Sequence, residues 1–335
     1  MGINEKPSQL KPADYASDQE VRWCPGCGDY AILNAVKKTL ADNQSDTKNT
    51  VFVSGIGCAS RLPYYMATYG FHTIHGRAPA FATGIKITNP ELDVWIITGD
   101  GDSLSIGGNH FIHVLRRNLN CQILLFNNEI YGLTKGQASP ASRIGTVSPT
   151  TLRGSIEAPL SACELALSSG ATFIARGVDT AIKQLVPTLR EAQKHIGASL
   201  VEIYQNCIVY NDDVFKSFTD KSVAIEKQIH LEDGKAMLFG QDNLKGLAIN
   251  KNYSALEIMD LDKNPNNINR VLIHDTKNKT IAYLLSQMNQ STMPVALGII
   301  YCIEKPTLDS NYTAKLNSHK NNISKIMEKG QTWTI

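Results

Sequence analysis

The 335-residue sequence has neither a long apolar run nor a strong excess of one charge. Its longest apolar runs, such as VWII, ILLF and VALGII, fall far short of the roughly 20 residues that a membrane-spanning helix needs. Lys and Arg number 33 against 31 Asp and Glu, which gives a net charge of +2. A protein that binds nucleic-acid phosphates needs a strongly basic face. We therefore expect no membrane span and no nucleic-acid partner.

The sequence also lacks a secretion signal and an even number of cysteines. Its first 21 residues are predominantly polar, which is not typical of a signal peptide. The cysteines number seven, and an odd count without a secretory signal argues against a disulfide framework. We therefore predict a cytoplasmic protein in which closely spaced cysteines serve metal or redox chemistry. With 42% hydrophobic residues, the chain can form a substantial core.

Four apolar strand patterns dominate the first two thirds of the chain. They cover 50–57, 93–102, 121–132 and 200–207, and most of them end in glycine, aspartate or asparagine. Helical patterns lie between them, including one over 109–117. This alternation predicts an α/β fold, a mostly parallel sheet with helices on both faces. Ligands of such sheets bind beyond the carboxyl ends of the strands, where the polar residues gather here.

A further helix is predicted near the N-terminus, and the character of the chain changes after about residue 215. Asp29 is expected to cap the first helix. The apolar face of this helix has the 3–4 spacing, with Ile32, Ala35, Val36 and Leu40. The stretch 251–280 is rich in Asn and Lys and has few strand signals. A helix is predicted around 278–289, followed by an apolar strand over 294–302.

These patterns divide the chain into three parts. We predict an N-terminal arm over 1–20 and a large ligand-binding domain over 21–215. The remainder, 216–335, is predicted to be a smaller C-terminal segment that packs on the core or on a partner. The sequence therefore indicates one large domain with an appendage rather than two equal domains.

Two of the predicted strands end in residues with oxygen ligands. Asp100 lies in GDGD after one strand, and Asn128 lies in NNEIYG after the next, a separation that fits one helix and a return strand. Mg²⁺ prefers such oxygen ligands, and the carbonyl of Ile130 could supply a third. Gly99 and Gly101 would let the backbone approach phosphates at a helix N-terminus. Taken singly, each motif could be an ordinary turn, but together they favour a magnesium–diphosphate site.

A GDG followed at this distance by NN resembles the thiamine diphosphate (TPP)-binding motif of TPP-dependent enzymes. By this resemblance, the bound metal is Mg²⁺. Its expected ligands are Asp100, Asn128 and the carbonyl oxygen of Ile130. The fold that the resemblance implies is the TPP-binding fold, with this chain supplying its pyrophosphate-type domain.

Four cysteines lie in turn-forming or strand-end positions. Cys24 and Cys27 form a CPGC motif, Cys58 follows GIG, and Cys207 follows the last predicted strand. Four thiolates from such positions could hold Zn²⁺ or a [4Fe–4S] cluster. A thioredoxin-like motif is the other option, but no strand precedes Cys24. The remaining cysteines lie in apolar contexts and are expected to be buried thiols: Cys121, Cys163 and Cys302.

A closer resemblance covers residues 20 to about 215. In order, the sequence contains WCPGCGDYAIL, GIGCASR, HGRAPAFATGIK, GDGDSLSIGGNH and NNEIYGLTKGQASP, and then Cys207. These motifs resemble the β subunit of 2-oxoacid:ferredoxin oxidoreductases, as does the later ALGIIYCIEKPTL. The resemblance implies a [4Fe–4S] cluster beside TPP, held by Cys24, Cys27, Cys58 and Cys207. One departure is Asn127, where Asp is common in this family.

The resemblance also implies which residues meet the cofactor and the substrate. The residues expected to contact TPP are Ile56, Gly57, Cys58, His75, Gly99, Asp100, Gly101, Asp102, Asn128, Ile130, Tyr131, Gly132, Leu133 and Thr134. Arg61 and Lys135 are cations suited to a substrate carboxylate, and Leu133 between them could set the pocket size. If both cations face the pocket, 2-oxoglutarate is favoured over pyruvate. Both could equally be solvated or pair with phosphate or a partner acid.

The activity implied is the coenzyme A-dependent oxidative decarboxylation of a 2-oxoacid. It proceeds through an enamine on TPP, whose electrons pass one at a time to the cluster and then to ferredoxin. The Glu that activates TPP has no candidate near these motifs, so an α subunit is expected to supply it. Two alternatives stay open. One is a non-oxidative TPP-dependent lyase or synthase with structural zinc, and the other is a redox-sensing iron–sulfur binding protein.

Overall fold

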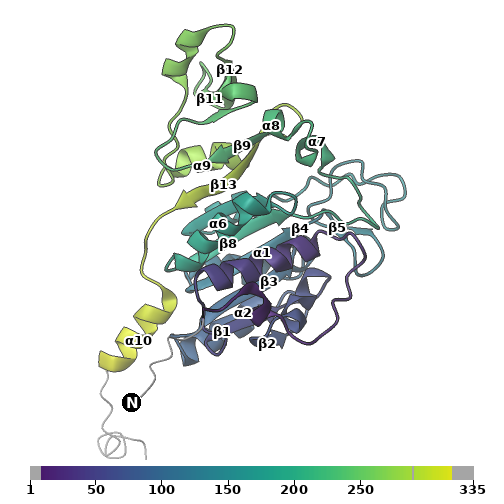
Figure 1. The fold of residues 1–335 in the computed structure, drawn as a ribbon, viewed down its shortest axis with the longest axis vertical. Coiled ribbons are helices and arrows are strands. Elements are labelled where there is room, and N and C mark those ends of the chain that lie inside the picture. The colour runs from purple at the N-terminus through teal and green to yellow at the C-terminus, as the bar shows by residue number, and fades with distance from the viewer. Residues whose placement is uncertain (1–8, 289, 319–335) are drawn as a thin grey trace, which may run out of the picture.

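A central sheet of eight strands organises the protein (Figure 1). The computed structural model describes residues 9–288 and 290–318. The strand order is β2-β1-β3-β4-β8-β7-β13-β9, and every neighbouring pair is parallel except β7 with β13. The strands are β1 (Thr50–Ser54), β2 (Tyr69–His72), β3 (Asp93–Gly99), β4 (Cys121–Asn127), β7 (Phe173–Val178), β8 (Ala198–Tyr204), β9 (Gln228–Leu231) and β13 (Val295–Cys302).

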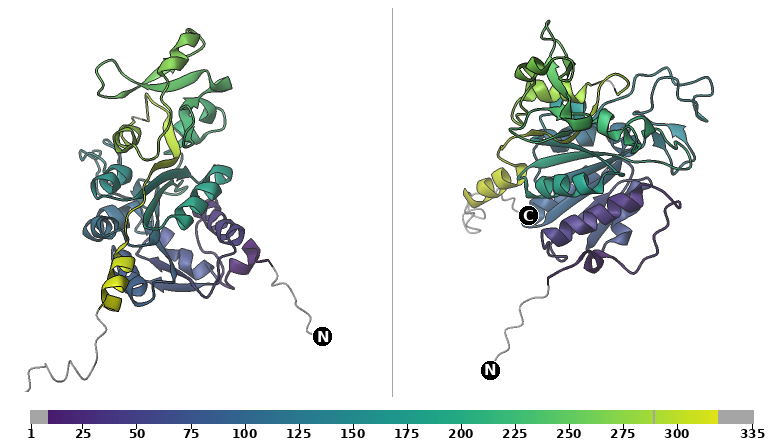
Figure 2. Two further views of the ribbon diagram at one scale, coloured as in Figure 1. Left: turned by 90° about the vertical axis from the view of Figure 1, so that its left-hand side faces the viewer. Right: turned by 45° about the horizontal axis from the view of Figure 1, so that its top comes forward.

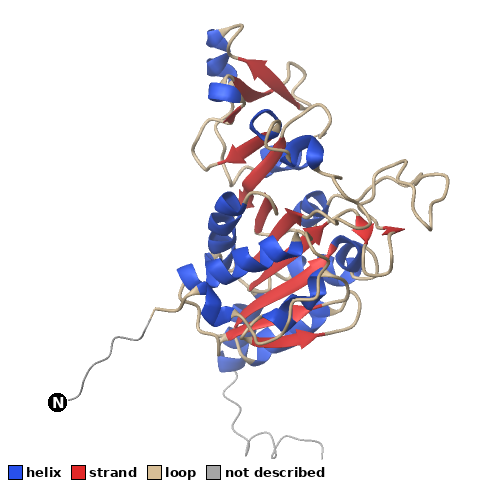
Figure 3. Cartoon of the chain, turned by 45° about the vertical axis from the view of Figure 1, so that its right-hand side comes forward, coloured by secondary structure: helices blue, strands red, loops and turns tan. Residues whose placement is uncertain are grey.

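Helices cover both faces of this sheet (Figures 2 and 3). One face carries α1 (Asp29–Asp42) and α6 (Ile182–Lys194). The other carries α2 (Ala78–Thr88), α4 (Gly108–Arg116), α5 (Ala162–Ser168) and α9 (Lys279–Ser286). Successive strand residues serve opposite faces: Trp95 packs in the α1 core and Ile96 in the α4 core. The predicted fold class, a mostly parallel sheet with helices on both faces, is confirmed.

Most predicted elements form within a few residues of their expected bounds, but the start of α1 differs. Its N-cap is Gly28, and Asp29 is the first helical residue, so the prediction that Asp29 caps this helix is wrong. The Asp29 carboxyl group points inward instead and is buried. The predicted strand over 121–132 ends at Asn127, and a separate short strand, β5 (Ile130–Tyr131), pairs with β6 (Gln137–Ala138).

Chain beyond residue 215 contributes β9 and β13 to the main sheet. It also forms a small antiparallel sheet at the top of Figure 1, made of β10 (Leu238–Phe239), β11 (Lys245–Ile249) and β12 (Leu256–Asp260). The stretch 251–280, which has few strand signals, contains β12, and this strand pairs with β11. The division into arm, domain and segment stays a prediction, and its residues 1–8, 289 and 319–335 lie outside the described chain.

Short elements complete the described chain. They are η1 (Pro12–Tyr15), η2 (Ala59–Tyr65), α3 (Asp100–Leu104), α7 (Lys216–Thr219), α8 (Ala224–Lys227), η3 (Gln241–Asn243), η4 (Pro265–Arg270) and α10 (Leu308–Ser318). Within residues 9–288 and 290–318, no helix is both long and apolar enough to cross a membrane.

Cys121 and Cys163 are buried as expected, but Cys302 is only half-buried, so that prediction is wrong for Cys302. Its strand, β13, has β9 and β7 as neighbours, and Cys302 lies at its end.

Candidate functional site

One pocket lies beyond the carboxyl ends of β1, β3, β4 and β8, and we call it the strand-end pocket. Parallel strands bring these ends to the same edge of the sheet. Every residue predicted to contact the cofactor lines it: Ile56, Gly57, Cys58, His75, Gly99, Asp100, Gly101, Asp102, Asn128, Ile130, Tyr131, Gly132, Leu133 and Thr134. Its other lining residues were not predicted there: Asp29, Ala59, Phe126 and Gln205.

Asp100 is a buried acid without a cation in this pocket. It is the first residue of α3 and is only 2% exposed. Ser139 Oγ donates to its Oδ2 at 2.5 Å. Burial raises the pKa of this carboxyl group to about 7, and none of the described residues lining the pocket is Lys or Arg. A divalent cation is the kind of partner that stabilises such a carboxylate, so the residues present fit Mg²⁺.

Asn128 lies next to Asp100 and is held by its own neighbours. Its backbone N–H interacts with the Asp100 carboxyl group, and its Nδ2 donates to Gln205 Oε1 at 2.8 Å. Its Oδ1 accepts from Ile130 N at 3.2 Å, which folds the chain into a tight turn. We call residues 127–132 the metal-binding turn. The structure therefore brings together the carboxylate, the amide and the peptide unit that were predicted as magnesium ligands.

Asp102 faces the protein rather than the open pocket. Its Oδ1 accepts from Ile56 N at 3.1 Å, from Gly76 N at 2.7 Å and from His75 Nδ1, and its Oδ2 accepts from Thr98 Oγ1 at 2.7 Å. Because both oxygen atoms are already engaged, Asp102 ties the loops after β1 and β2 to β3. The contact to Nδ1 leaves Nε2 of His75 as the ring nitrogen available to a ligand.

Gly101 and Tyr131 are in close contact across the pocket. Tyr131 Oη donates to the Gly101 carbonyl oxygen at 3.1 Å. A Cβ atom added at Gly101 would lie 2.2 Å from Tyr131 Cε1, so only glycine leaves room for the ring here. The metal-binding turn is thereby packed directly on the start of α3.

The Gly101→Ala variant is expected to weaken Mg²⁺–TPP binding about tenfold, because Tyr131 must move and overpacking costs about 1–3 kcal/mol. Isothermal titration calorimetry would measure the affinity. Gly84→Ala is the matched control, since an added Cβ at this helical glycine meets no atom within 4 Å. Equal affinities for the two variants would contradict the prediction.

The four predicted cluster ligands come from three segments of the chain, and hydrogen bonds connect these segments. Cys24 and Cys27 close a turn in which Cys27 N donates to Cys24 O at 3.0 Å and Gly26 has a φ of 84°. Pro followed by a glycine with positive φ is typical of a type II turn. Trp23 Nε1 donates to the Cys58 carbonyl oxygen at 2.7 Å. Gly28 N donates to Asn206 O at 3.2 Å, next to Cys207.

Two of these thiols face the metal-binding turn. A Cβ atom added at Gly132 would lie 3.4 Å from Cys207 Sγ and 3.7 Å from Cys58 Sγ. Burial raises the pKa of Cys58 to about 12 and raises that of Cys27 further, with the nearby Asp29 carboxyl group adding to both shifts. Thiolates at these positions therefore need a cationic partner, as a bound metal centre would provide.

The cysteines share one neighbourhood without forming a single-ion site. The charge of Cys207 raises the pKa of both Cys27 and Cys58, and Cys24 also affects Cys58. Yet among the residues that the structure describes, no three His, Cys, Asp or Glu side chains are arranged to hold one metal ion. A four-iron cluster binds each cysteine through a different iron atom, so its ligands stand further apart than those of one zinc ion. Within the described residues, the cysteines are therefore neighbours that are not arranged around one ion.

Asp29 is a second buried acid in the strand-end pocket. It is 1% exposed, and neither carboxylate oxygen has a hydrogen-bond partner within the described residues. Burial raises the pKa of this group to about 7. The Cys27 thiol nearby stabilises the charged form of Asp29 and opposes this shift only in part. Asp29 was predicted as a helix cap and not as a pocket residue, and its position two residues after Cys27 was the one signal for the pocket.

The predicted substrate residues are only partly brought together. Arg61 and Leu133 line a neighbouring cavity of about 360 Å³ that shares Ile56 and Gly57 with the strand-end pocket. Arg61 Nε donates to Tyr65 Oη at 3.1 Å, which leaves its terminal nitrogens for a ligand. Lys135 is exposed, has a φ of 78°, and lines neither pocket.

The chain is similar to known proteins along its whole length. Residues 55–203 match the family described as thiamine pyrophosphate enzyme, C-terminal TPP binding domain. The 2-oxoglutarate oxidoreductase subunit KorB of Mycobacterium tuberculosis is 42% identical over 344 residues, covering 100% of this chain and 91% of that protein. A 2-oxoacid:ferredoxin oxidoreductase subunit β from Sulfolobus sp. is 46% identical over 203 residues, covering 60% and 67%. The chain belongs to the 2-oxoacid:ferredoxin oxidoreductase β subunits.

A solved structure agrees with this family. The 2-oxoglutarate:ferredoxin oxidoreductase from Magnetococcus marinus, determined with 2-oxoglutarate, coenzyme A and succinyl-CoA bound, superposes with a TM-score of 0.79. The two chains are 31% identical, and the match covers 98% of each. The same β-subunit architecture therefore extends over the C-terminal segment as well as over the strand-end pocket.

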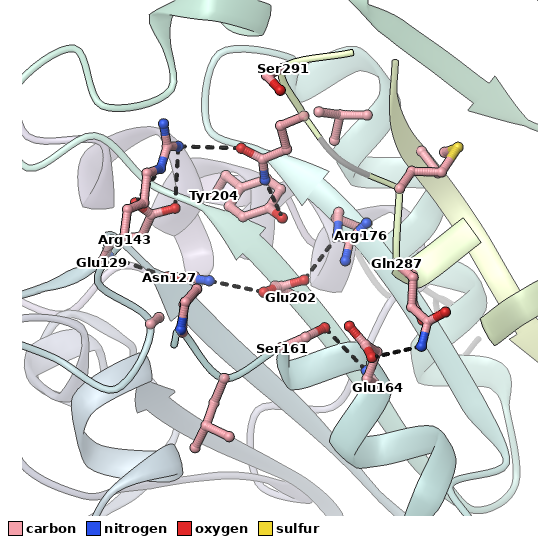
Figure 4. Close-up of a pocket in the computed structure, with 18 of the residues that line it drawn as sticks. Asn127, Glu129, Arg143, Ser161, Glu164, Arg176, Glu202, Tyr204, Gln287 and Ser291 are labelled. Carbon is pink, nitrogen blue, oxygen red and sulfur yellow. Dashed lines mark hydrogen bonds and ion pairs between the residues drawn. The ribbon is translucent and has the colours of Figure 1, made fainter. Parts of the chain in front are cut away.

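Alternate residues of the metal-binding turn in this β subunit face two different cavities. Asn128 and Ile130 line the strand-end pocket, whereas Asn127 and Glu129 line a second cavity of about 400 Å³ (Figure 4). Asn127 Nδ2 donates there to Glu202 Oε1 at 2.9 Å. An aspartate at position 127 would instead set two carboxylates against each other. Asn127, where Asp is common in the family, therefore suits the neighbouring carboxylate of Glu202.

A buried ion pair supports the turn from this second cavity. Arg176 Nε contacts Glu202 Oε2 at 2.8 Å, and the two side chains are 6% and 3% exposed. Nearer the surface, Arg143 Nε contacts Glu129 Oε2 at 2.8 Å (Figure 4). Glu202 therefore links β7, through Arg176, to Asn127 at the end of β4.

The Arg176→Met variant of the β subunit is expected to lose about 3–5 kcal/mol of unfolding free energy, because Glu202 would stay buried without its cation. Urea denaturation would measure the loss. The double variant Arg176→Met/Glu202→Gln removes both charges and should recover most of the stability. If the double variant is no more stable than the single one, the unpaired charge of Glu202 is not the cause of the loss.

Proposed function

We propose that this chain is the β subunit of a coenzyme A-dependent 2-oxoglutarate:ferredoxin oxidoreductase. The observation that carries the proposal is the strand-end pocket, where the magnesium ligand set lies on the metal-binding turn and the thiols of Cys58 and Cys207 face Gly132 of the same turn. The Mycobacterium tuberculosis relative and the Magnetococcus marinus structure are both named for 2-oxoglutarate, and both match over nearly the whole chain. We take pyruvate as the alternative substrate.

In this proposal, Asp100, Asn128 and the Ile130 carbonyl oxygen would hold Mg²⁺, whose charge would balance that of a diphosphate. When bound, TPP supplies the stabilised carbanion that makes decarboxylation of a 2-oxoacid possible. Asp102 holds His75 through Nδ1, so that Nε2 can donate to or accept from a ligand oxygen. Gly101 and Gly132 let ligand and backbone approach closely.

Cys24, Cys27, Cys58 and Cys207 hold a [4Fe–4S] cluster in this proposal. The contacts around Gly132 support a position for it next to the cofactor, which suits transfer of single electrons to the cluster and onward to ferredoxin. Structural zinc is the lesser alternative because the thiols are not arranged around one ion. Free cysteines and such a cluster are typical of reducing compartments, so we assign the enzyme to the cytoplasm.

We assign substrate binding to Arg61 and Leu133, with Lys135 as a cation that would have to turn inward. The Arg61 guanidinium group could bind the second carboxylate of 2-oxoglutarate in the neighbouring cavity, which pyruvate lacks. Rates with the two oxoacids, measured on the enzyme co-expressed with its α subunit, distinguish them. A higher kcat/KM for pyruvate would overturn the assignment of the substrate.

An α subunit is part of the proposal because the strand-end pocket supplies no glutamate for activating the cofactor. None of the described residues lining that pocket is a glutamate. We therefore assign the activating Glu to an α subunit, in an αβ heterodimer or a dimer of such heterodimers. Coenzyme A is the acyl acceptor and ferredoxin the electron acceptor of this assembly.

The proposal is tested by anaerobic purification of the αβ complex, a visible spectrum, and iron, zinc and thiamine assays. A brown protein with bound TPP and about four irons per β subunit supports it. A colourless zinc protein with bound TPP would favour a non-oxidative lyase or synthase. Iron without TPP would favour a redox-sensing binding protein.

A further inference from the structure

Gln205 lies between the two proposed metal sites and was not among the predicted site residues. It is the first residue after β8 and is 1% exposed. Its backbone N–H donates to Asn127 O at 2.9 Å, at the end of the neighbouring strand β4. The side chain therefore begins at a fixed point, between the metal-binding turn and the CPGC segment.

Its carboxamide makes a hydrogen bond toward each site. Oε1 accepts from Asn128 Nδ2 at 2.8 Å, and Nε2 donates to Cys27 Sγ at 3.2 Å. Nε2 also donates to Asn206 O at 2.6 Å, which fixes the orientation of the amide. A neutral amide can donate and accept at once, so it connects an amide and a sulfur without burying a charge.

On the magnesium side, the contact determines which way Asn128 faces. With Nδ2 engaged by Gln205, Oδ1 is the atom of Asn128 that can meet a cation, beside the hydrogen bond that it accepts from Ile130 N. Groups that orient metal ligands in this way commonly contribute 10–100-fold to metal affinity. Gln205 has the geometry of such a group for Asn128.

On the sulfur side, Gln205 donates to one proposed cluster ligand. Hydrogen bonds to cysteine sulfur stabilise the electron-rich reduced cluster and so raise its reduction potential. Cys27 is half-buried, and the Asp29 carboxyl group nearby works in the opposite direction. A donor placed here therefore offsets nearby negative charge.

We propose that Gln205 is a positioning residue for both centres: it orients Asn128 toward Mg²⁺ and tunes the cluster through Cys27. This inference rests on the proposed function. Its two contacts can be separated by substitution, because Gln205→Glu keeps an acceptor for Asn128 and removes the donor to Cys27, whereas Gln205→Met removes both.

The test uses the αβ complex and two readouts besides activity. Redox titration followed by electron paramagnetic resonance gives the cluster potential, and calorimetry gives the Mg²⁺-dependent affinity for TPP. We expect Gln205→Glu to lower the potential and to leave the TPP affinity close to wild type. We expect Gln205→Met to lower the potential less and to weaken TPP binding by about 10–100-fold.

Gln228→Glu is the matched control, since Gln228 is also a buried glutamine, but its Nε2 donates to Phe218 O far along the sheet. A Gln205→Glu potential equal to that of the control would overturn the tuning, and an unchanged TPP affinity in Gln205→Met would overturn the positioning. If Gln205→Glu fails to retain iron, the TPP affinity of Gln205→Met, measured by calorimetry, tests the proposal on the magnesium side. A wild-type complex without iron or TPP would instead overturn the proposed function.

Discussion

Replacement of Asp100 by asparagine is expected to lower the Mg²⁺–TPP affinity by more than about 100-fold and to abolish turnover. The groups that merely orient metal ligands already contribute 10–100-fold, and Asp100 is the only carboxylate among the three proposed ligands. Calorimetry with TPP and Mg²⁺ would measure the affinity, and steady-state rates would measure turnover. Asp93→Asn is the control, because Asp93 is a half-buried aspartate that begins β3, the strand that ends just before Asp100.

The same substitution should stabilise the metal-free chain at pH 8. Burial raises the pKa of Asp100 from 3.8 to about 7, so the folded chain binds this proton more tightly than the unfolded chain does. Its contribution to stability is present below the unfolded pKa of 3.8 and is lost as the pH rises from there through about 7. D100N removes that titration. The unfolding free energy should therefore fall less between pH 5 and pH 8 in this variant than in the wild type. An unchanged pH dependence together with unchanged TPP affinity would contradict the assignment.

Replacement of Cys207 by serine is expected to remove the cluster and with it the reduction of ferredoxin. Serine is a poor substitute for a thiolate ligand, and about four irons per β subunit should be lost together because the cluster needs four ligands. Iron analysis, the visible spectrum and ferredoxin-linked rates would all report the loss. TPP binding should persist, since Cys207 is not among the residues that line the strand-end pocket.

Cys302→Ser provides the control for this substitution. Cys302 is a half-buried free cysteine at the end of β13, with His195 Nδ1 at 3.9 Å from its Sγ. Its replacement should leave iron content and spectrum unchanged. If the cluster survives in Cys207→Ser, or is lost equally in Cys302→Ser, the fourth ligand is not Cys207.

Local patterns were sufficient to predict the centre of this fold and the residues of its pocket. The strands ending at Gly99 and Asn127 are continuous apolar runs, as expected for strands covered on both faces. Because the carboxyl ends of parallel strands share an edge, a motif after each run could be assigned to one site without knowing any contact. This is why Gly99, Asp100 and Asn128 line a single pocket, whereas the full set of cofactor residues was implied by the family resemblance.

Features that depend on distant partners were not predictable in this way. Strand β7 was missed because Arg176 interrupts its apolar run, and the charge is tolerated only because Glu202 on β8 pairs with it. Strand β2 is exposed at the edge of the sheet, so it has no buried pattern. Gln205 reads as an ordinary polar residue after a strand until its neighbours Asn128 and Cys27 are known.

The antiparallel strand β13 has a consequence for how the chain reaches its folded state. β7 ends at Val178, but the strand that covers its free edge begins only at Val295. During synthesis, at about 5–20 residues per second, that edge stays open while the intervening chain emerges. Pairings between such distant segments form slowly, and an open edge can pair with another chain. Premature termination before β13 is therefore expected to yield an aggregating fragment even though every cofactor residue has already been made.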